Sequence, residues 1–224
     1  LLGPVSFLRL SKTTDGSPVL DLLDALLPAY AQLFARLADA GADWVQVDEP
    51  VLALDLDDAT RSAFAHAYAM LAQGPRPSVL LTTGSGALED NLTLAANLPV
   101  EGLHVDLVRA PEQLDAVLQA LPPDRVLSAG LVDGRNIWRT PLDNALVLAR
   151  YAQTERGADR LWLAPSCSLL HSPVDLCLEK KLDPELRSWL AFARQKLEEL
   201  RVLADALDGV PAAGQALQRT REAL

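Results

Sequence analysis

Short apolar runs alternate with amphipathic stretches along most of the chain, and this alternation limits the folds that it can adopt. Most of the runs are apolar without a break, as expected of strands buried on both faces of a parallel sheet. We predict six strands, at residues 1–8, 44–47, 78–82, 102–107, 125–132 and 160–164. Such alternation predicts right-handed βαβ units, arranged as an open doubly wound sheet or as a (β/α)8 barrel that lacks two units.

The predicted helices begin with recognisable start signals. Ser17-Pro18, Thr140-Pro141 and Asp183-Pro184 each place a capping side chain before a proline, which is favourable in the first helical turn. The last long helix begins at Asp183 and is expected to end near Gly209. Residues 210–224 are weakly patterned, which predicts a frayed tail. No low-complexity linker interrupts the chain, so we predict no internal domain boundary.

Composition excludes several classes of function. Half of the 224 residues are hydrophobic and 22% are charged, so the chain can bury a sizeable core. The net charge of -10 repels phosphate backbones, so we expect no nucleic acid as a partner. No apolar run has the roughly 18 residues that a membrane span needs, so we expect no membrane as a partner either. The two cysteines, Cys167 and Cys177, fit a reducing compartment, and we expect the cytoplasm.

Polar residues follow the carboxyl ends of five predicted strands. In both architectures these ends carry the functional loops. The residues are Asp48, Glu49, Thr83, Ser85, His104, Asp106, Asp133, Arg135, Asn136, Ser166, Cys167 and His171. We predict a concave polar site at this edge, with five of them binding substrate: Asp48, Glu49, Arg135, Asn136 and His171.

Single residues of this set also have simpler explanations. Asp48 and Glu49 could cap the next helix, and Cys167 could be an inert buried thiol. No H-x-C, C-x-x-C or H-E-x-x-H motif occurs, so the residues by themselves predict no zinc site. The sequence also lacks the G-x-S-x-G elbow of serine hydrolases and a Gly-rich dinucleotide fingerprint.

Five stretches taken together are more specific than any single motif. They are LLGPVSFLRLSK, AGADWVQVDEPVLALDL, NLPVEGLHVDLVRAPEQLDAVL, VLSAGLVDGRNIWR and DRLWLAPSCSLLHSPVDLCLEKKLDPELRSWLAFARQKLEEL. In this order they resemble the amino-terminal half of cobalamin-independent methionine synthase. The resemblance implies an incomplete (β/α)8 TIM barrel, with six of eight βα units in residues 1–208. Residues 209–224 would then be a weakly ordered tail leading toward a missing carboxyl-terminal barrel.

The resemblance also implies a reaction, in which the parent enzyme transfers a methyl group from 5-methyltetrahydrofolate polyglutamate to homocysteine without cobalamin. In the family a catalytic zinc is held in the carboxyl-terminal barrel, and the amino-terminal barrel contributes to folate binding. Thr83 and Ser85 stand where the duplicated barrel has its zinc-binding His and Cys. Asp106 stands where it has Glu, Cys167 where it has the second Cys, and Arg135 where it has the catalytic His. The resemblance therefore implies that this chain holds no zinc and is inactive alone.

Two alternatives stay open at this point. The chain could be a stand-alone, non-catalytic barrel that binds a ligand, or another barrel enzyme that uses Asp48 and Glu49 as an acid/base pair. Because the sequence starts at Leu1 and has no signal-peptide pattern, we expect it to be a piece of a longer protein.

Overall fold

The computed structural model describes residues 1–223, and its parallel sheet forms from the apolar runs of the sequence. The strands are β1 (Trp44–Asp48), β2 (Ser78–Thr82), β3 (Gly102–Asp106), β4 (Val126–Val132) and β5 (Leu161–Pro165), in this spatial order. Every residue of β3 and β4 is buried, as expected of strands covered on both faces. The sequence predicted each of these five strands to within one residue at either end.

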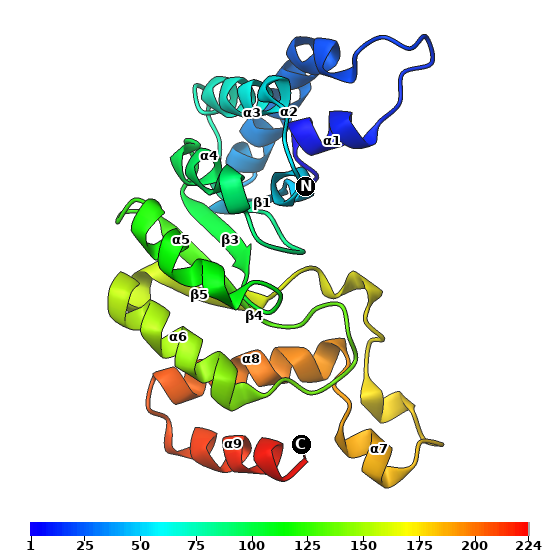
Figure 1. The fold of residues 1–224 in the computed structure, drawn as a ribbon, viewed down its shortest axis with the longest axis vertical. Helices are drawn as coiled ribbons and strands as arrows, with labels where there is room; N and C mark the ends of the chain where they lie inside the picture. The colour runs from blue at the N-terminus through cyan, green and yellow to red at the C-terminus, as the bar shows by residue number, and fades with distance from the viewer. Residues whose placement is uncertain (224) are drawn as a thin grey trace. The chain divides into compact units, whose positions relative to one another are not determined.

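Helices precede the first strand, connect the strands and follow the last of them (Figure 1). They are α1 (Pro4–Leu10), α2 (Leu23–Asp39), α3 (Asp58–Leu71), α4 (Leu92–Asn97), α5 (Leu114–Ala120), α6 (Leu142–Arg156), α7 (Pro184–Ser188), α8 (Ala193–Leu207) and α9 (Pro211–Ala223). The fold is therefore of the α/β class with a parallel five-stranded sheet, as the alternation predicted.

The chain divides into two compact units that share the sequence in alternating segments. Unit 1 contains Leu1–Val105 and Asp115–Leu127, and unit 2 contains Asp106–Leu114 and Ser128–Leu224. β4 begins in unit 1 and ends in unit 2. The division therefore does not coincide with a linker in the sequence.

Unit 1 combines β1, β2 and nearly all of β3 with α1 to α4 and most of α5. β1 pairs with β2 and β2 with β3, both in parallel. α1, α2 and α3 pack against one another, and Phe34 of α2 and Phe64 of α3 are among the largest fully buried side chains. The carboxylate of Asp57 caps α3, accepting a hydrogen bond from the backbone N–H of Thr60 at 2.7 Å. Buried aromatic rings and a capped helix thus hold this unit together.

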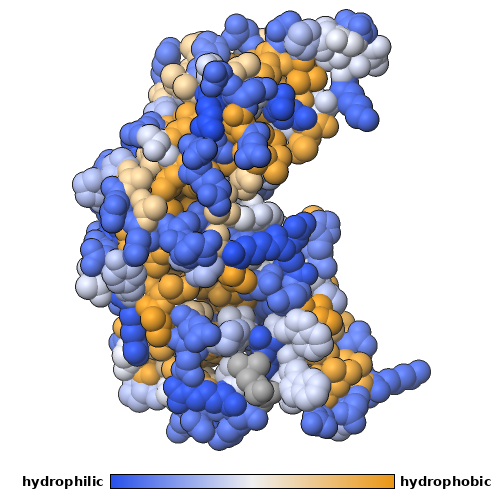
Figure 2. Space-filling view, in the orientation of Figure 1, coloured by the Kyte–Doolittle hydropathy of each residue, from blue (hydrophilic) through white to orange (hydrophobic). Residues whose placement is uncertain are grey.

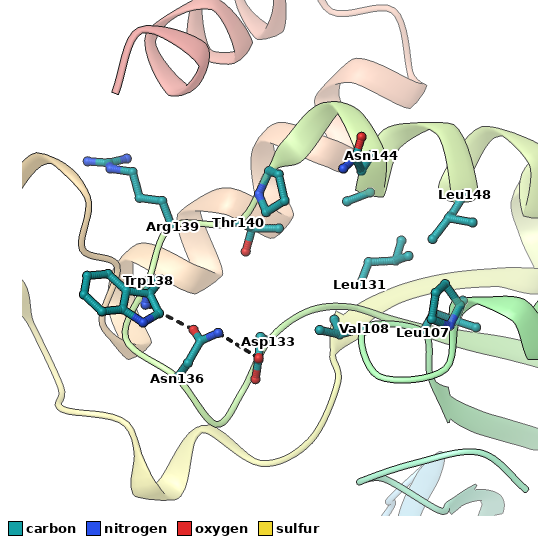
Figure 3. Close-up of a pocket in the computed structure, with 13 residues that line it drawn as sticks. Leu107, Val108, Leu131, Asp133, Asn136, Trp138, Arg139, Thr140, Asn144 and Leu148 are labelled. Carbon is teal, nitrogen blue, oxygen red and sulfur yellow. Dashed lines mark hydrogen bonds between the residues drawn. The ribbon is translucent and has the colours of Figure 1, made fainter. Parts of the chain in front are cut away.

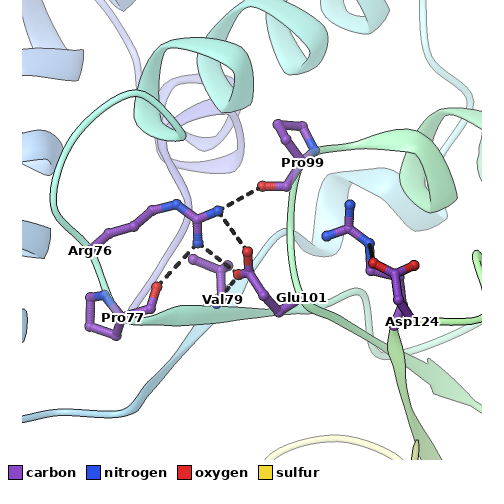
Figure 4. A network of polar contacts seen from close by, with 7 residues as sticks. Arg76, Pro77, Val79, Pro99, Glu101 and Asp124 are labelled. Atoms are coloured by element: carbon purple, nitrogen blue, oxygen red, sulfur yellow. Dashed lines mark hydrogen bonds and ion pairs between the residues drawn. The ribbon is translucent and has the colours of Figure 1, made fainter.

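An arginine clamp joins the starts of β2 and β3 within unit 1 (Figure 4). The two terminal nitrogens of Arg76 donate to the two carboxylate oxygens of Glu101 at 2.7 and 2.8 Å, and to the carbonyls of Pro77 and Pro99. The N–H of Val79 also donates to Glu101 at 2.7 Å. Burial acts to raise the pKa of Glu101, but the bonds from Arg76 and Val79 outweigh it and lower that pKa. The clamp lies at the amino ends of the strands, where we assign it a structural role.

Unit 2 is organised around α8, which packs against α6, α9 and β5. The backbone N–H of Ser166 donates to the carbonyl of Val132 at 2.7 Å and links the ends of β4 and β5. Arg221 of α9 binds Asp143 of α6 through two bonds of 2.7 Å. The carboxylate of Asp183 caps α7, as the sequence predicted.

The first predicted strand is wrong. Leu1 and Gly3 form backbone hydrogen bonds with the end of β1 on either side of a single bridge from Leu2 to Asp48, but Pro4 then begins helix α1. The run PVSFLRL is apolar enough for a strand, but proline is favourable in the first turn of a helix. A distant carboxylate, Glu49, accepts the free N–H groups of that turn. The sheet therefore has five strands rather than six among residues 1–223.

The predicted end of the chain also needs correction. The expected long helix from Asp183 to Gly209 is two helices, α7 and α8, and Leu190 between them forms an antiparallel bridge with Trp138. The expected frayed tail forms helix α9. Ala213, Leu217 and Thr220 are buried at positions four and three residues apart, so tertiary packing compensates for the weak sequence pattern.

Polar and charged residues cover much of the face shown in Figure 2, in keeping with the net charge of -10. Among the described residues, the three most exposed large apolar side chains are Leu170, Val174 and Leu178, which lie between β5 and α7. Among residues 1–223, no helix is both long and apolar enough to cross a membrane.

Candidate functional site

The predicted site residues are distributed over both units. Asp48 and Glu49 belong to unit 1, and Arg135, Asn136 and His171 belong to unit 2. Asp48 is the last residue of β1, and the other positions follow the carboxyl ends of β1, β4 and β5, as the sequence predicted.

Glu49 points into unit 1, and its side chain has no accessible surface. The backbone N–H of Ser6 donates to Oε2 at 2.7 Å, and the N–H of Val5 and the hydroxyl of Tyr68 donate to Oε1 at 3.4 and 3.1 Å. Burial raises the pKa of Glu49 to about 7, although these bonds act in the opposite direction. Asp48 is half-buried and accepts a bond from the side chain of Gln46 at 2.7 Å. Glu49 therefore caps α1 from the interior, and nothing in this geometry supports an acid/base pair with Asp48.

Replacing Glu49 by glutamine is expected to change how stability depends on pH. The pKa of Glu49 is about 7 in the folded chain and about 4.5 without burial, so protonation stabilises the fold fully below pH 4.5, and this stabilisation is lost as the pH rises to 7. We expect the free energy of unfolding of the wild type, relative to E49Q, to fall by about 3 kcal/mol between pH 4 and pH 8. Urea unfolding at several pH values measures it. The exposed control Glu112→Gln should show no such change, and parallel pH curves for wild type and E49Q would refute the prediction.

Other polar residues at the strand ends are used for turns. The hydroxyl of Thr83 donates to the carbonyl of His104 at 2.9 Å, both in unit 1, and Thr83 is 1% exposed. In unit 2, Oδ1 of Asp106 accepts the backbone N–H groups of Val108 and Arg109, both at 3.0 Å. These two side chains fix the backbone that follows β2 and β3.

The loop after β4 is ordered by its own side chains (Figure 3). Oδ1 of Asp133 accepts the backbone N–H of Arg135, and Oδ2 accepts the side-chain N–H of Asn136, both at 2.7 Å. Oδ1 of Asn136 accepts the N–H of Trp138 at 3.1 Å. Because Asp133 and Asn136 hold the turn, the exposed guanidinium of Arg135 is presented from a fixed backbone.

Two buried charged residues of α8 support this loop, and the sequence reasoning missed both. Lys196 is 0% exposed, and its ammonium donates to Oδ1 of Asn136 and to the carbonyl of Trp138, both at 3.1 Å. Glu199 is 5% exposed and accepts the backbone N–H of Thr140 at 3.1 Å. Burial lowers the pKa of Lys196 and raises that of Glu199. Their spacing from buried Leu203 placed both on the core face of α8, a signal available in the sequence.

Cys167 and His171 follow β5. A side chain at Gly134 would lie 2.5 Å from the carbonyl oxygen of Cys167 and 3.0 Å from its sulfur, so only glycine allows the two loops to approach this closely. Burial raises the pKa of Cys167, although a bond with Ser166 and the charge of Arg135 act against it. Cys167 is therefore a thiol near neutral pH and a poor nucleophile. His171 ends the 3-10 turn Leu169–His171 and is exposed.

The positions that match zinc ligands in the duplicated barrel do not fit a zinc ion. Thr83 is engaged with a backbone carbonyl, and Asp106 with two backbone N–H groups. Within residues 1–223, no three His, Cys, Asp or Glu side chains are grouped so that they could hold a metal ion. That the chain binds no zinc stays a prediction, which this donor chemistry supports.

Comparison with known proteins identifies close relatives. A 5-methyltetrahydropteroyltriglutamate–homocysteine methyltransferase of Xylella fastidiosa (strain M23) is 69% identical over 224 residues, which are 100% of this chain and 30% of the relative. A protein of the same name from Acidiphilium cryptum (strain JF-5) is 56% identical over 226 residues, covering 100% of this chain and 29% of the relative. The chain thus spans about 30% of the length of these curated relatives.

Solved structures share the fold at low sequence identity. A B12-independent methionine synthase from Shewanella sp. W3-18-1, solved in complex with selenomethionine, matches with a TM-score of 0.69 and 15% identity, over 93% of this chain and 61% of that one. A methyltransferase from Methanosarcina mazei matches with a TM-score of 0.64 and 18% identity, over 92% and 57%.

A match to a family model shows which family the chain belongs to. The model described as "Cobalamin-independent synthase, N-terminal domain" matches residues 1–156. This match and the 69% identity confirm the resemblance seen in the sequence. The chain belongs to the cobalamin-independent synthase family, as part of its N-terminal domain.

Proposed function

We propose that this chain is part of an enzyme that transfers a methyl group from 5-methyltetrahydropteroyltriglutamate to homocysteine to form methionine, without cobalamin. The observation that carries the proposal is the 69% identity, over the whole chain, to a protein named for these two substrates. Residues 1–208 would form part of an amino-terminal (β/α)8 barrel, and residues 209–224 would lead toward the rest of the enzyme. The likeness to solved structures supports this fold.

In this proposal the chain contributes residues that bind the substrates, and another part of the enzyme binds the zinc. The substrate-binding residues would be Asp48 of unit 1 and Arg135, Asn136 and His171 of unit 2, while buried Glu49, which the sequence placed in the same set, would hold α1 instead. A guanidinium such as that of Arg135 forms paired hydrogen bonds with carboxylates, which a triglutamate tail carries in number. Asn136 and Lys196 would position Arg135 by fixing its loop.

The chain by itself is expected to be catalytically inactive. A zinc-bound thiolate is the reactive form of homocysteine in this proposal, and the residues described here offer no group that would hold the zinc. Placement of the two substrates also requires elements outside the chain, and mis-positioning by about 1 Å can already cost ~100-fold in rate.

Binding and turnover, measured on the purified chain, test this proposal together. Isothermal titration with the triglutamyl folate is expected to show weak binding that Arg135→Gln reduces roughly tenfold, the loss of one charge-assisted contact. Arg150→Gln, an exposed change on α6, serves as the control and should leave binding unchanged. Methionine formation from homocysteine, folate and zinc should stay at the buffer background. Turnover above background, or equal binding by R135Q and R150Q, would overturn the assignment.

A further inference from the structure

Three arginines line one cleft of unit 2. The cleft has a volume of about 400 Å³ and lies between the loop after β4, helix α7 and the first turns of α8. Arg139 comes from the loop, Arg187 from α7 and Arg194 from α8. Glu198 is the one carboxylate among the described residues of this wall. The cleft therefore carries an excess of positive charge, although the net charge of the chain is -10.

Arg139 is half-buried and is held in place by the end of α7. Its backbone N–H donates to the carbonyl of Trp189 at 2.8 Å, and its side-chain Nε donates to the carbonyl of Ser188. Among residues 1–223, the two terminal nitrogens of this guanidinium have no hydrogen-bond partner. Glu199 attracts Arg139, but the charge of Glu199 is offset first by the ammonium of Lys196. Arg139 thus presents two free donor nitrogens from a fixed position.

Arg187 has no partner for its charge in the part of the chain that the structure describes. It lies in the last turn of α7 and is half-buried, and its guanidinium forms no hydrogen bond and no ion pair there. Arg194 differs, because it is ion-paired with Asp175 at 3.0 Å and with Glu198 at 3.4 Å. The carboxylates near the cleft therefore offset Arg194 and leave the charges of Arg139 and Arg187 uncompensated.

The chemistry of this wall selects an organic anion. A guanidinium forms paired hydrogen bonds with carboxylate and phosphate groups, and two guanidiniums from different elements can each hold one such group. A cleft of about 400 Å³ has the size of a small-molecule site and exceeds the need of a single ion. Leu176 and Pro184 line the same cleft and can contact a carbon body between the two charged groups.

We propose that this cleft binds a small organic molecule with at least two anionic groups, carboxylate or phosphate, one of them paired with Arg139 and one with Arg187. The site is separate from the proposed function, because the cleft is lined by none of the four residues assigned to substrate binding. Figure 3 shows the side chain of Arg139 extending away from Asn136, the one of those four that it labels.

Four probes test the proposal by isothermal titration on the full chain. Tricarballylate carries three carboxylates, phosphoglycolate carries a phosphate and a carboxylate, tricarballylamide is the uncharged match of the first, and acetate carries a single carboxylate. At least one of the two polyanions is expected to bind, and at least tenfold more tightly than the amide and acetate do. The tighter of the two identifies the anionic group that the cleft prefers. Binding by neither polyanion, or equal binding by tricarballylamide, would overturn the proposal.

Two variants with opposite expected effects assign the binding to the cleft. Arg187→Gln should weaken binding of the tighter probe roughly tenfold, the loss of a charge-assisted contact. Glu198→Gln removes the carboxylate of the wall and should strengthen it roughly twofold. Arg219→Gln, an exposed change on α9, is the charge-matched control and should leave binding unchanged. Equal binding by R187Q and R219Q, or weaker binding by E198Q, would show that the probe binds elsewhere.

Arg135→Gln separates this site from the proposed folate contact. It should leave binding of the tighter probe unchanged, whereas the proposed function expects it to weaken binding of the triglutamyl folate. A loss of probe binding in R135Q as large as in R187Q would make the cleft part of the folate site and would overturn the proposal of a separate ligand. Circular dichroism confirms that each variant is folded, and E198Q decides should R187Q fail to fold.

Discussion

Gly3→Ala is expected to lower the free energy of unfolding of the full chain by about 4 kcal/mol. A methyl group at this position would lie 2.6 Å from Cγ of Glu49 and would overlap its carboxyl group. Glu49 cannot move aside freely, because it is fully buried and accepts bonds from Ser6, Val5 and Tyr68. The variant must therefore either displace α1 or break the bonds of a buried carboxyl group. Urea unfolding followed by circular dichroism measures the change.

Gly74→Ala is the matched control for this prediction. It lies in the same unit, and an added methyl group would meet nothing within 4 Å. Its effect should stay within about 1 kcal/mol of the wild type. The double variant G3A/E49A tests the cause, because removing the carboxyl group makes room for the methyl group. If G3A is as stable as G74A, or if G3A/E49A is much less stable than E49A alone, overlap with Glu49 is not the reason.

Lys196→Met should lower the free energy of unfolding by about 3 kcal/mol, because two buried acceptors lose the hydrogen bonds of a charged donor. Methionine fills similar space but offers no donor to Asn136 or to the carbonyl of Trp138. Glu199 also loses the ammonium that offsets its charge. The loop after β4 should loosen, seen as a shift and broadening of the Asn136 side-chain amide signals in NMR.

Two further variants serve as controls for K196M: one changes an exposed lysine, and the other adds a substitution of Glu199. Lys180→Met removes a charge at an exposed site and should change stability by less than about 0.5 kcal/mol. Adding Glu199→Gln to K196M removes the unbalanced carboxylate and should recover at least about 1 kcal/mol. If the two substitutions are simply additive, Lys196 and Glu199 do not act as a pair.

The predicted site was partly accessible from the sequence. Asp48, Arg135, Asn136 and His171 were predicted because the carboxyl ends of parallel strands carry functional loops, and the structure places Asp48 at the end of β1 and the other three after strands. The partner that holds Asn136 was not found, because Lys196 lies 60 residues further along the chain. The spacing from Leu203 put Lys196 on the core face of α8, but a charged residue on a helix is ordinarily solvated, so the partner of Lys196 becomes visible only when the opposing loop is in place.

Local pattern alone determined the α/β class and the five strands, because continuous apolar runs and the spacing of apolar residues act over a few positions. Only the tertiary structure decided what became of Leu1–Leu10. Its apolar run suits a strand or a helix, and the choice rests on a carboxylate from Glu49, which accepts the N–H of Ser6 across 43 positions. Thr140 shows the same limit: the sequence predicted it as the cap of α6, but α6 has Pro141 at its cap position, and Glu199 accepts the backbone N–H of Thr140. Free N–H groups and buried charges take whichever partner the packed chain brings near, and that partner is set by the fold.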